Sequence, residues 1–226
     1  MNGIIIVAAI LFTKILFTPF AGSGQPSNLL SDSTLAEGGL TINHPLQRTA
    51  VEAIENASIG GVGGKLIAQQ MDQQAAALKQ SLKGVTLERI AEGILITFPS
   101  QDLFAQDSYE ILPATRVRFR NLARIMNKFH HTCLLIEVHT DNTGEEVYNL
   151  TLSDKRAKSL ENFLLKEGVN NNRLLSKGYG NKQPLSPNTT IEGRHVNRRV
   201  EVAVFANDEM KALARKGEAG EFLAVK

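Results

Sequence analysis

Residues 137–156 read EVHTDNTGEEVYNLTLSDKR and combine the end of a strand, a polar turn and the first half of a helix. The apolar residues 133–136, continued by Val138, predict a buried strand. Residues 139–144, HTDNTG, are typical of a turn that leads into a helix. Apolar residues then recur with helical spacing as far as residue 164. The stretch therefore predicts a strand–turn–helix unit of an α/β fold.

Two charged side chains of this unit are expected to meet in one crevice. Asp141 lies in the turn, and Asn149, Ser153 and Arg156 share one helix face at positions i, i+4 and i+7. Ligands of open α/β sheets bind at the carboxyl ends of strands, where this turn lies. An Asp accepts hydrogen bonds from an ammonium and an Arg binds a carboxylate bidentately, so the pair suits a zwitterion. The alternative is that Asp141 caps the helix and Arg156 forms a weak surface ion pair.

Four motifs, in this order, resemble the OmpA C-terminal, peptidoglycan-binding domain family, which includes the wall-binding domains of MotB and Pal. They are HTDNTG at 139–144, YNLTLSDKRA at 148–157, GYG at 178–180 and GRHVNRRVEV at 193–202. The resemblance covers roughly residues 85–206. It implies an α/β fold of the α+β sandwich kind, in which a mixed sheet has helices packed on one face.

The resemblance also implies a site for the diaminopimelate of the peptidoglycan stem peptide. In the family, the Asp of the TD pair and the Arg of the helix grip the ammonium and the carboxylate at the side-chain end of diaminopimelate. By motif match these are Asp141 and Arg156. The complete expected site consists of Asp141, Arg156, Asn149, Arg198, Thr140, Asn142 and Asp107.

The sequence departs from the family pattern at two places near this site. Val138 stands where the family usually has Gly, which predicts a stiffer strand end or a narrower approach. The loop after the first strand often contains Phe-Asp in the family, whereas here Phe104 is followed by Ala105. Asp107 stands nearby and is expected to replace the missing carboxylate.

Residues 1–22 are expected to form a secretory signal peptide or an uncleaved membrane anchor. Residues 3–22 are apolar apart from Lys14, and this run is long enough to span a bilayer. Small residues at its end are typical of a signal-peptide cleavage site. No Lys or Arg precedes the run and Lys14 interrupts it, so both alternatives stay open. Either one implies export, and the expected location is the periplasm or the cell outer membrane.

The rest of the chain divides into four parts. Residues 23–58 are rich in Ser, Gly, Asn, Thr and Pro and predict a linker. Residues 59–84 predict a Gly-rich joint and an amphipathic helix, whose apolar stripe would pair with a second copy as a homodimer or pack on the domain. Residues 85–206 predict the OmpA-like domain, and residues 207–226 predict a charged C-terminal tail that is either a short helix or frayed.

Within the domain, apolar periodicity and turn residues predict seven elements. Strands are expected at 85–90, 94–98, 133–138, 173–178 and 197–205, and helices at 109–130 and 146–167. The first two strands are expected to form a hairpin.

Composition and spacing argue against other functions. The net charge of 25 − 23 = +2 gives no electrostatic case for nucleic-acid binding. No HExxH or HxxxH spacing offers a zinc site, and no Ser or Cys lies in a nucleophile elbow, so no catalytic residue, metal or cofactor is expected. His139 is expected to be structural, and the single cysteine, Cys133, to be buried and inert.

The predicted function is that of a non-catalytic, peptidoglycan-binding envelope protein that tethers the outer membrane or an envelope complex to the cell wall. The expected partners are peptidoglycan and a membrane, reached through the N-terminal segment or a partner protein. The alternative is a wall-anchoring subunit held by an uncleaved N-terminal helix, as in MotB. Proton conduction is not expected, because residues 3–22 contain no acidic residue.

Overall fold

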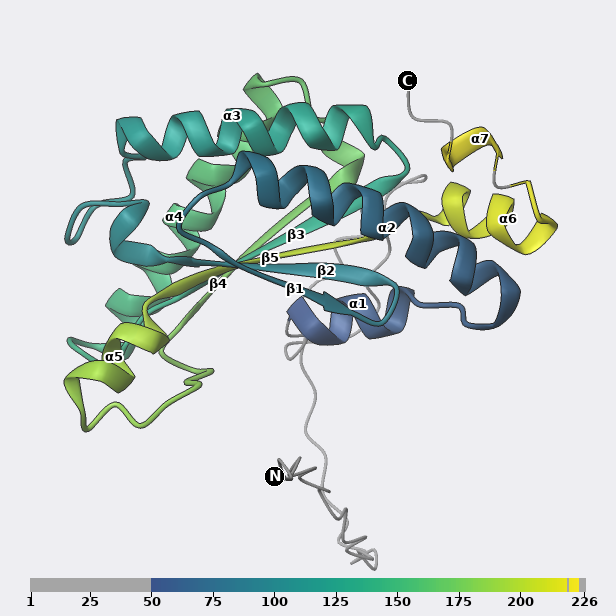
Figure 1. The fold of residues 1–226 in the computed structure, drawn as a ribbon. Helices are drawn as coiled ribbons and strands as arrows, with labels where there is room; N and C mark the ends of the chain where they lie inside the picture. Colours follow the sequence, from purple (N-terminus) through teal and green to yellow (C-terminus); the bar gives the residue numbers. More distant parts are fainter. Residues whose placement is uncertain (1–49, 219, 224–226) are drawn as a thin grey trace, which may run out of the picture. The chain divides into compact units, whose positions relative to one another are not determined.

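The computed structural model describes residues 50–218 and 220–223 (Figure 1). The expected signal peptide or anchor at 1–22 lies outside this part of the chain, as does the expected linker up to residue 49. Within the described residues, every helix is too short or too polar to span a bilayer.

Five strands form one mixed sheet in the order β1-β2-β5-β3-β4. The strands are β1 Thr86–Ile90, β2 Gly93–Pro99, β3 Thr132–His139, β4 Leu174–Gly180 and β5 Arg199–Ala206. Neighbours pair antiparallel except β3 and β4, which are parallel. A parallel pair needs a crossover connection, and α4 (Glu146–Lys166) provides it. The predicted hairpin, strand–turn–helix unit and five strands are thus confirmed.

One face of the sheet is covered by helices that share the main apolar core. These are α2 Gly61–Ser81, α3 Pro113–Lys128, α4 and α6 Asp208–Lys216 (Figure 1). The apolar stripe of α2, which includes Ile67, Met71 and Leu78, is fully buried in this core. Of the two roles predicted for that stripe, packing on the domain is therefore confirmed. The predicted mixed sheet with helices packed on one face is also confirmed.

The opposite face of the sheet carries a cover that the sequence analysis did not predict. Helix α1, Ala50–Ala57, buries Ala50, Ala53, Ile54 and Ala57 against a second, smaller apolar cluster (Figure 1). These residues recur at the three- and four-residue intervals of one helix face. The predicted linker over 23–58 is therefore wrong for residues 50–57.

The charged C-terminal segment, for which a short helix or a frayed tail was expected, contains a helix. Residues 208–216 form α6, which begins after the side-chain cap of Asn207 on the Met210 amide, 2.8 Å away. Met210 and Ala214 are buried in the main core. Apolar contacts therefore extend the compact part beyond residues 85–206 at both ends.

The remaining short elements are η1 Ser100–Asp102, η2 Asn171–Arg173, α5 Ile191–Asn197 and α7 Gly220–Leu223. The helix predicted over 109–130 begins only at Pro113, because proline suits the first helical position. Ser108 does not cap this helix, since its hydroxyl accepts a hydrogen bond from the Glu110 amide in the preceding loop.

Close packing of α4 on β4 sets the position of the helix. A Cβ added at Gly178 would lie 2.1 Å from the backbone nitrogen of Asp154, so only glycine fits there. Gly180 has φ +56°, and its amide donates to the Ser153 hydroxyl, 2.8 Å away. The GYG motif therefore fixes the helix face that carries Asn149 and Arg156.

Candidate functional site

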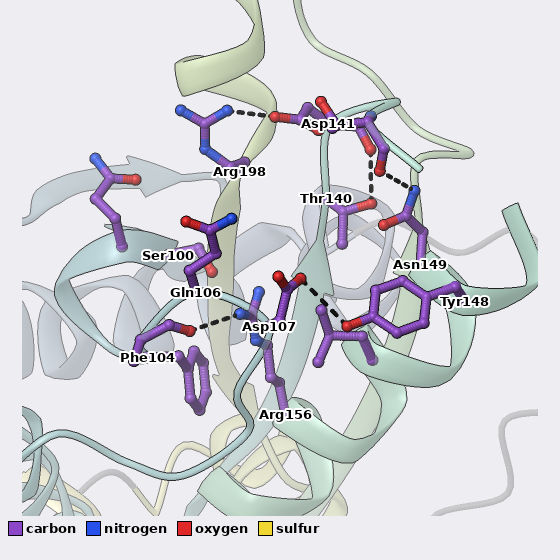
Figure 2. Close-up of a pocket in the computed structure, with 14 residues that line it drawn as sticks. Ser100, Phe104, Gln106, Asp107, Thr140, Asp141, Tyr148, Asn149, Arg156 and Arg198 are labelled. Carbon is purple, nitrogen blue, oxygen red and sulfur yellow. Dashed lines mark hydrogen bonds and ion pairs between the residues drawn. The ribbon is translucent and has the colours of Figure 1, made fainter. Parts of the chain in front are cut away.

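A cavity of about 390 Å³ lies where β2 and β3 end and β5 begins (Figure 2). Its walls come from the loop after β2, the turn after β3, one face of α4 and the residue before β5. The lining residues are Ser100, Gln101, Phe104, Ala105, Gln106, Asp107, Thr140, Asp141, Thr143, Tyr148, Asn149, Leu152, Arg156 and Arg198. The cavity therefore forms at the strand ends, where the sequence predicted a crevice.

Asp141 holds one end of the cavity and forms an ion pair with Arg198 (Figure 2). Its Oδ1 also accepts a hydrogen bond from the Thr143 amide, 2.8 Å away. Burial alone would raise the pKa of Asp141, but the hydrogen bonds from Thr143 and Arg198 outweigh it and hold the pKa below its usual value. Asp141 is therefore an ionised carboxylate at neutral pH. It stabilises the turn and does not cap α4, whose N-cap is Glu145.

Arg156 projects from α4 into the other side of the cavity. Its Nε donates to the Ser108 carbonyl at 2.7 Å, and its Nη2 donates to the Ala105 carbonyl at 3.1 Å. The guanidinium also lies over the Phe104 ring, 5.0 Å from the centroid. The side chain is buried, and this desolvation lowers the pKa of Arg156 from its very high usual value. Arg156 is thus a rigidly held cation, not the surface ion pair of the alternative interpretation.

Asp107 and Tyr148 form a third polar group between these two. The Tyr148 hydroxyl donates to Asp107 Oδ1 at 3.2 Å (Figure 2). Asp107 adopts φ +52°, a left-handed conformation that is uncommon for residues other than glycine. The loop therefore turns sharply at Asp107 and places this carboxylate in the cavity wall.

A model of the OmpA family matches residues 103–198, which include every one of these polar groups. This part of the chain is therefore similar to the OmpA family. Among curated proteins, the probable lipoprotein YiaD of Escherichia coli is 31% identical over 147 residues, which is 64% of this chain and 65% of YiaD. The peptidoglycan-binding protein ArfA of Mycobacterium tuberculosis is 35% identical over 101 residues, which is 45% of this chain and 31% of ArfA. The match thus spans less than two thirds of either relative.

Solved structures share the fold of this chain. A putative MotB-like protein from Desulfovibrio vulgaris has a TM-score of 0.59 at 23% identity, over 65% of this chain and 97% of that one. The cell wall anchor of the T6SS from Pseudomonas aeruginosa has a TM-score of 0.51 at 26% identity, over 62% of this chain and 97% of that one. The α+β fold predicted from the motifs is therefore shared with known structures.

Six of the seven residues expected in the OmpA-like site line the cavity, and they make contacts that the sequence did not specify. Asn149 donates from Nδ2 to the Thr143 carbonyl at 2.9 Å, and the Thr140 hydroxyl donates to the Asp141 carbonyl at 2.8 Å. The structure does not place Asn142 in the lining. It is exposed on the turn, and Thr143 lines the cavity in its place.

Several lining residues were missed, among them Gln101, Gln106 and Tyr148. The loop at 98–107 could be predicted to lie on the ligand side, but an irregular loop has no periodicity that shows which side chains face inward. Tyr148 stands beside the predicted Asn149 on α4, and its half-exposed ring lines the cavity with its hydroxyl donating a hydrogen bond to Asp107.

Proposed function

We propose that this chain is a non-catalytic, peptidoglycan-binding envelope protein that grips the diaminopimelate of the stem peptide in this cavity. The observation that carries the proposal is that an ionised carboxylate, Asp141, and a buried guanidinium, Arg156, line the same cavity. Two similarities support the proposal: one to ArfA, a peptidoglycan-binding protein, and one to the cell wall anchor of the T6SS.

The ligand's ammonium is assigned to Asp141. Asp141 accepts hydrogen bonds from Thr143 and Arg198, and its two carboxylate oxygens together offer about four lone pairs, so further donors can bind. Asn149 and Thr140 stand beside it and complete the polar lining. Asp107 supplies a second carboxylate to the cavity wall. This carboxylate would replace the one that is missing because Ala105 stands where the family often has Asp.

The ligand's carboxylate is assigned to Arg156. Because Nε and one Nη2 hydrogen are used by backbone carbonyls, the guanidinium presents its Nη1–Nη2 edge to a ligand. These contacts and the Phe104 ring orient the edge before a ligand arrives, so little rotamer entropy is lost on binding. The cavity contains two carboxylates and two guanidiniums, and this balance suits a zwitterion.

The cellular role follows from attachment to the wall. We place the protein in the periplasm or at the cell outer membrane, where it would tether that membrane or an envelope complex to peptidoglycan. A wall-anchoring subunit held by an uncleaved N-terminal helix is the second candidate, and the similarity to the T6SS cell wall anchor favours it. The α2 stripe suggested for a homodimer is already buried in the protein's own core.

Pull-down on purified diaminopimelate-containing sacculi tests the proposal. Charge-assisted hydrogen bonds contribute about 1.5–3 kcal/mol each, so Asp141→Ala or Arg156→Ala should weaken binding about tenfold to a hundredfold. Asp154→Ala is the matched control, because Asp154 lies on α4 but is exposed outside the cavity lining. Equal retention of wild type, control and both site variants, with folding verified by circular dichroism, would refute the proposed site.

A further inference from the structure

The second face of the sheet contains a buried polar cluster near the first residue of α1. It consists of Glu137 and His139 on β3 and Glu201 on β5, all at most 5% exposed. His139 Nε2 lies 3.8 Å from Glu137 Oε2 and 3.9 Å from Glu201 Oε2. None of the three lines the cavity described above. The proposed binding of peptidoglycan therefore does not account for this cluster.

Among the described residues, several atoms of the cluster lack a hydrogen-bond partner. Neither ring nitrogen of His139 has a hydrogen bond within the described part of the chain, and the same is true of Glu137 Oε1. Buried polar groups in folded proteins are nearly always hydrogen-bonded or bound to an ion or water. An imidazole that is almost completely buried, lies beside two carboxylates and has no hydrogen bond to a described residue therefore points to a ligand.

We propose that Glu137, His139 and Glu201 form a binding site for one divalent cation, for which zinc is the best fit. One imidazole nitrogen and two carboxylate oxygens are a donor set that zinc accepts. With zinc–ligand bonds of about 2.0–2.2 Å, ligand atoms on a tetrahedral ion lie roughly 3.4 Å apart. The three ligand atoms lie within 4.8 Å of one another, so side-chain shifts of less than about 1 Å bring them around a common ion.

The surrounding contacts hold the ligands in place. Glu201 Oε1 accepts a hydrogen bond from Arg199 Nε at 2.7 Å, and Oε2 of the same carboxylate lies on the side of His139. Glu137 Oε2 accepts from the Ala50 amide at 2.7 Å, and the His139 ring stacks on Tyr179 with centroids 5.4 Å apart. Such outer contacts orient ligands in known metal sites.

The charges in the cluster favour a cation. Glu137 and Glu201 are paired directly across the β3–β5 ladder, where like charges repel. Arg199 pairs with Glu201, and among the described residues no Lys or Arg pairs with Glu137, so a bound divalent cation would favour the ionised form of Glu137.

Sheet pairing explains why the sequence did not indicate this site. Zinc motifs are recognised by short spacings such as HxxxH, whereas here Glu137 and His139 are separated by one residue on a strand. The third ligand is 62 residues farther along the chain than His139 and arrives through the antiparallel register of β3 and β5. A cation here would also tie α1 to the sheet, because Glu137 holds the first amide of that helix.

Metal titration of the full-length, metal-free chain in detergent solution tests this inference. Isothermal titration calorimetry with zinc should give one site per chain, and zinc should raise the thermal midpoint. Cobalt added in place of zinc should produce visible d–d absorption. His139→Gln or Glu201→Gln should weaken zinc binding at least tenfold, and glutamine at 201 keeps an acceptor for Arg199.

The control variant is His131→Gln. The tilted rings of His131 and His130 have centroids 4.1 Å apart, and His131 lies 3.3 Å from Glu209, so these histidines are another place where zinc could bind adventitiously. Zinc binding should be unchanged in this variant. The inference is overturned if wild type binds no zinc, if His139→Gln binds as tightly as wild type, or if His131→Gln removes the binding. The wild-type titration alone decides the first outcome, even where a buried variant does not fold.

Discussion

Replacement of Ile54 by alanine tests whether α1 is an integral cover of the sheet. Ile54 is fully buried, and truncation of such a side chain to alanine costs about 2–5 kcal/mol. Because α1 precedes the rest of the described fold, we expect most of this loss to appear as local detachment of the helix. A loss of about 2.8 kcal/mol would raise the population of the detached state about a hundredfold.

Cys133 reports this detachment directly. It is buried in the same apolar cluster as Ile54, and burial raises the pKa of its thiol to about 11, so the native protein should react slowly with thiol reagents. Ile54→Ala should accelerate labelling at least tenfold, whereas the control Glu55→Ala, at an exposed position of α1, should not. Unchanged labelling and stability in Ile54→Ala would refute the docking of α1.

Three further predictions concern the core and the site. A chain that starts at Gly84 should lose cooperative unfolding, because it lacks Ile67, Met71 and Leu78, each of which contributes about 1.5–3 kcal/mol by burial; a sharp thermal transition of that fragment would contradict this. Sacculus binding should stay constant from pH 7 to about pH 5. The depressed pKa of Asp141 keeps it ionised there, and binding is lost only as the pH falls through that low value; a marked loss above pH 5 would refute the assignment. Arg156→Lys should restore only part of the affinity lost in Arg156→Ala, since an ammonium lacks the planar fork that also bonds Ser108 and Ala105; full recovery in a pull-down would argue against two-point recognition.

The strand–turn–helix unit could be predicted because its apolar residues change from strand to helix periodicity within one short stretch. Helix α1 could not, since two turns whose buried residues are mostly alanine, in a region rich in linker-type residues, leave a weak apolar pattern. Its role is visible only once Ile54 meets the second face of the sheet.

The site shows the same division between local and long-range information. Asp141 and Arg156 could be predicted from one continuous motif. The direct pairing of Asp141 with Arg198, 57 residues away, depends on sheet order, and the support of Arg156 by Ala105 and Ser108 depends on an irregular loop. Asn142 was expected in the site because it adjoins Asp141 in sequence, yet adjacent residues of a turn need not face the same way.

The most direct test of the central claim compares two soluble stem peptides that differ only in the third residue, diaminopimelate or lysine. Lysine retains the ammonium assigned to Asp141 but lacks the carboxylate assigned to Arg156. Isothermal titration calorimetry should show about tenfold to a hundredfold weaker binding of the lysine peptide to wild type. In Arg156→Ala the two peptides should bind alike. Equal affinity of wild type for both peptides would contradict the claim that Arg156 recognises the diaminopimelate carboxylate.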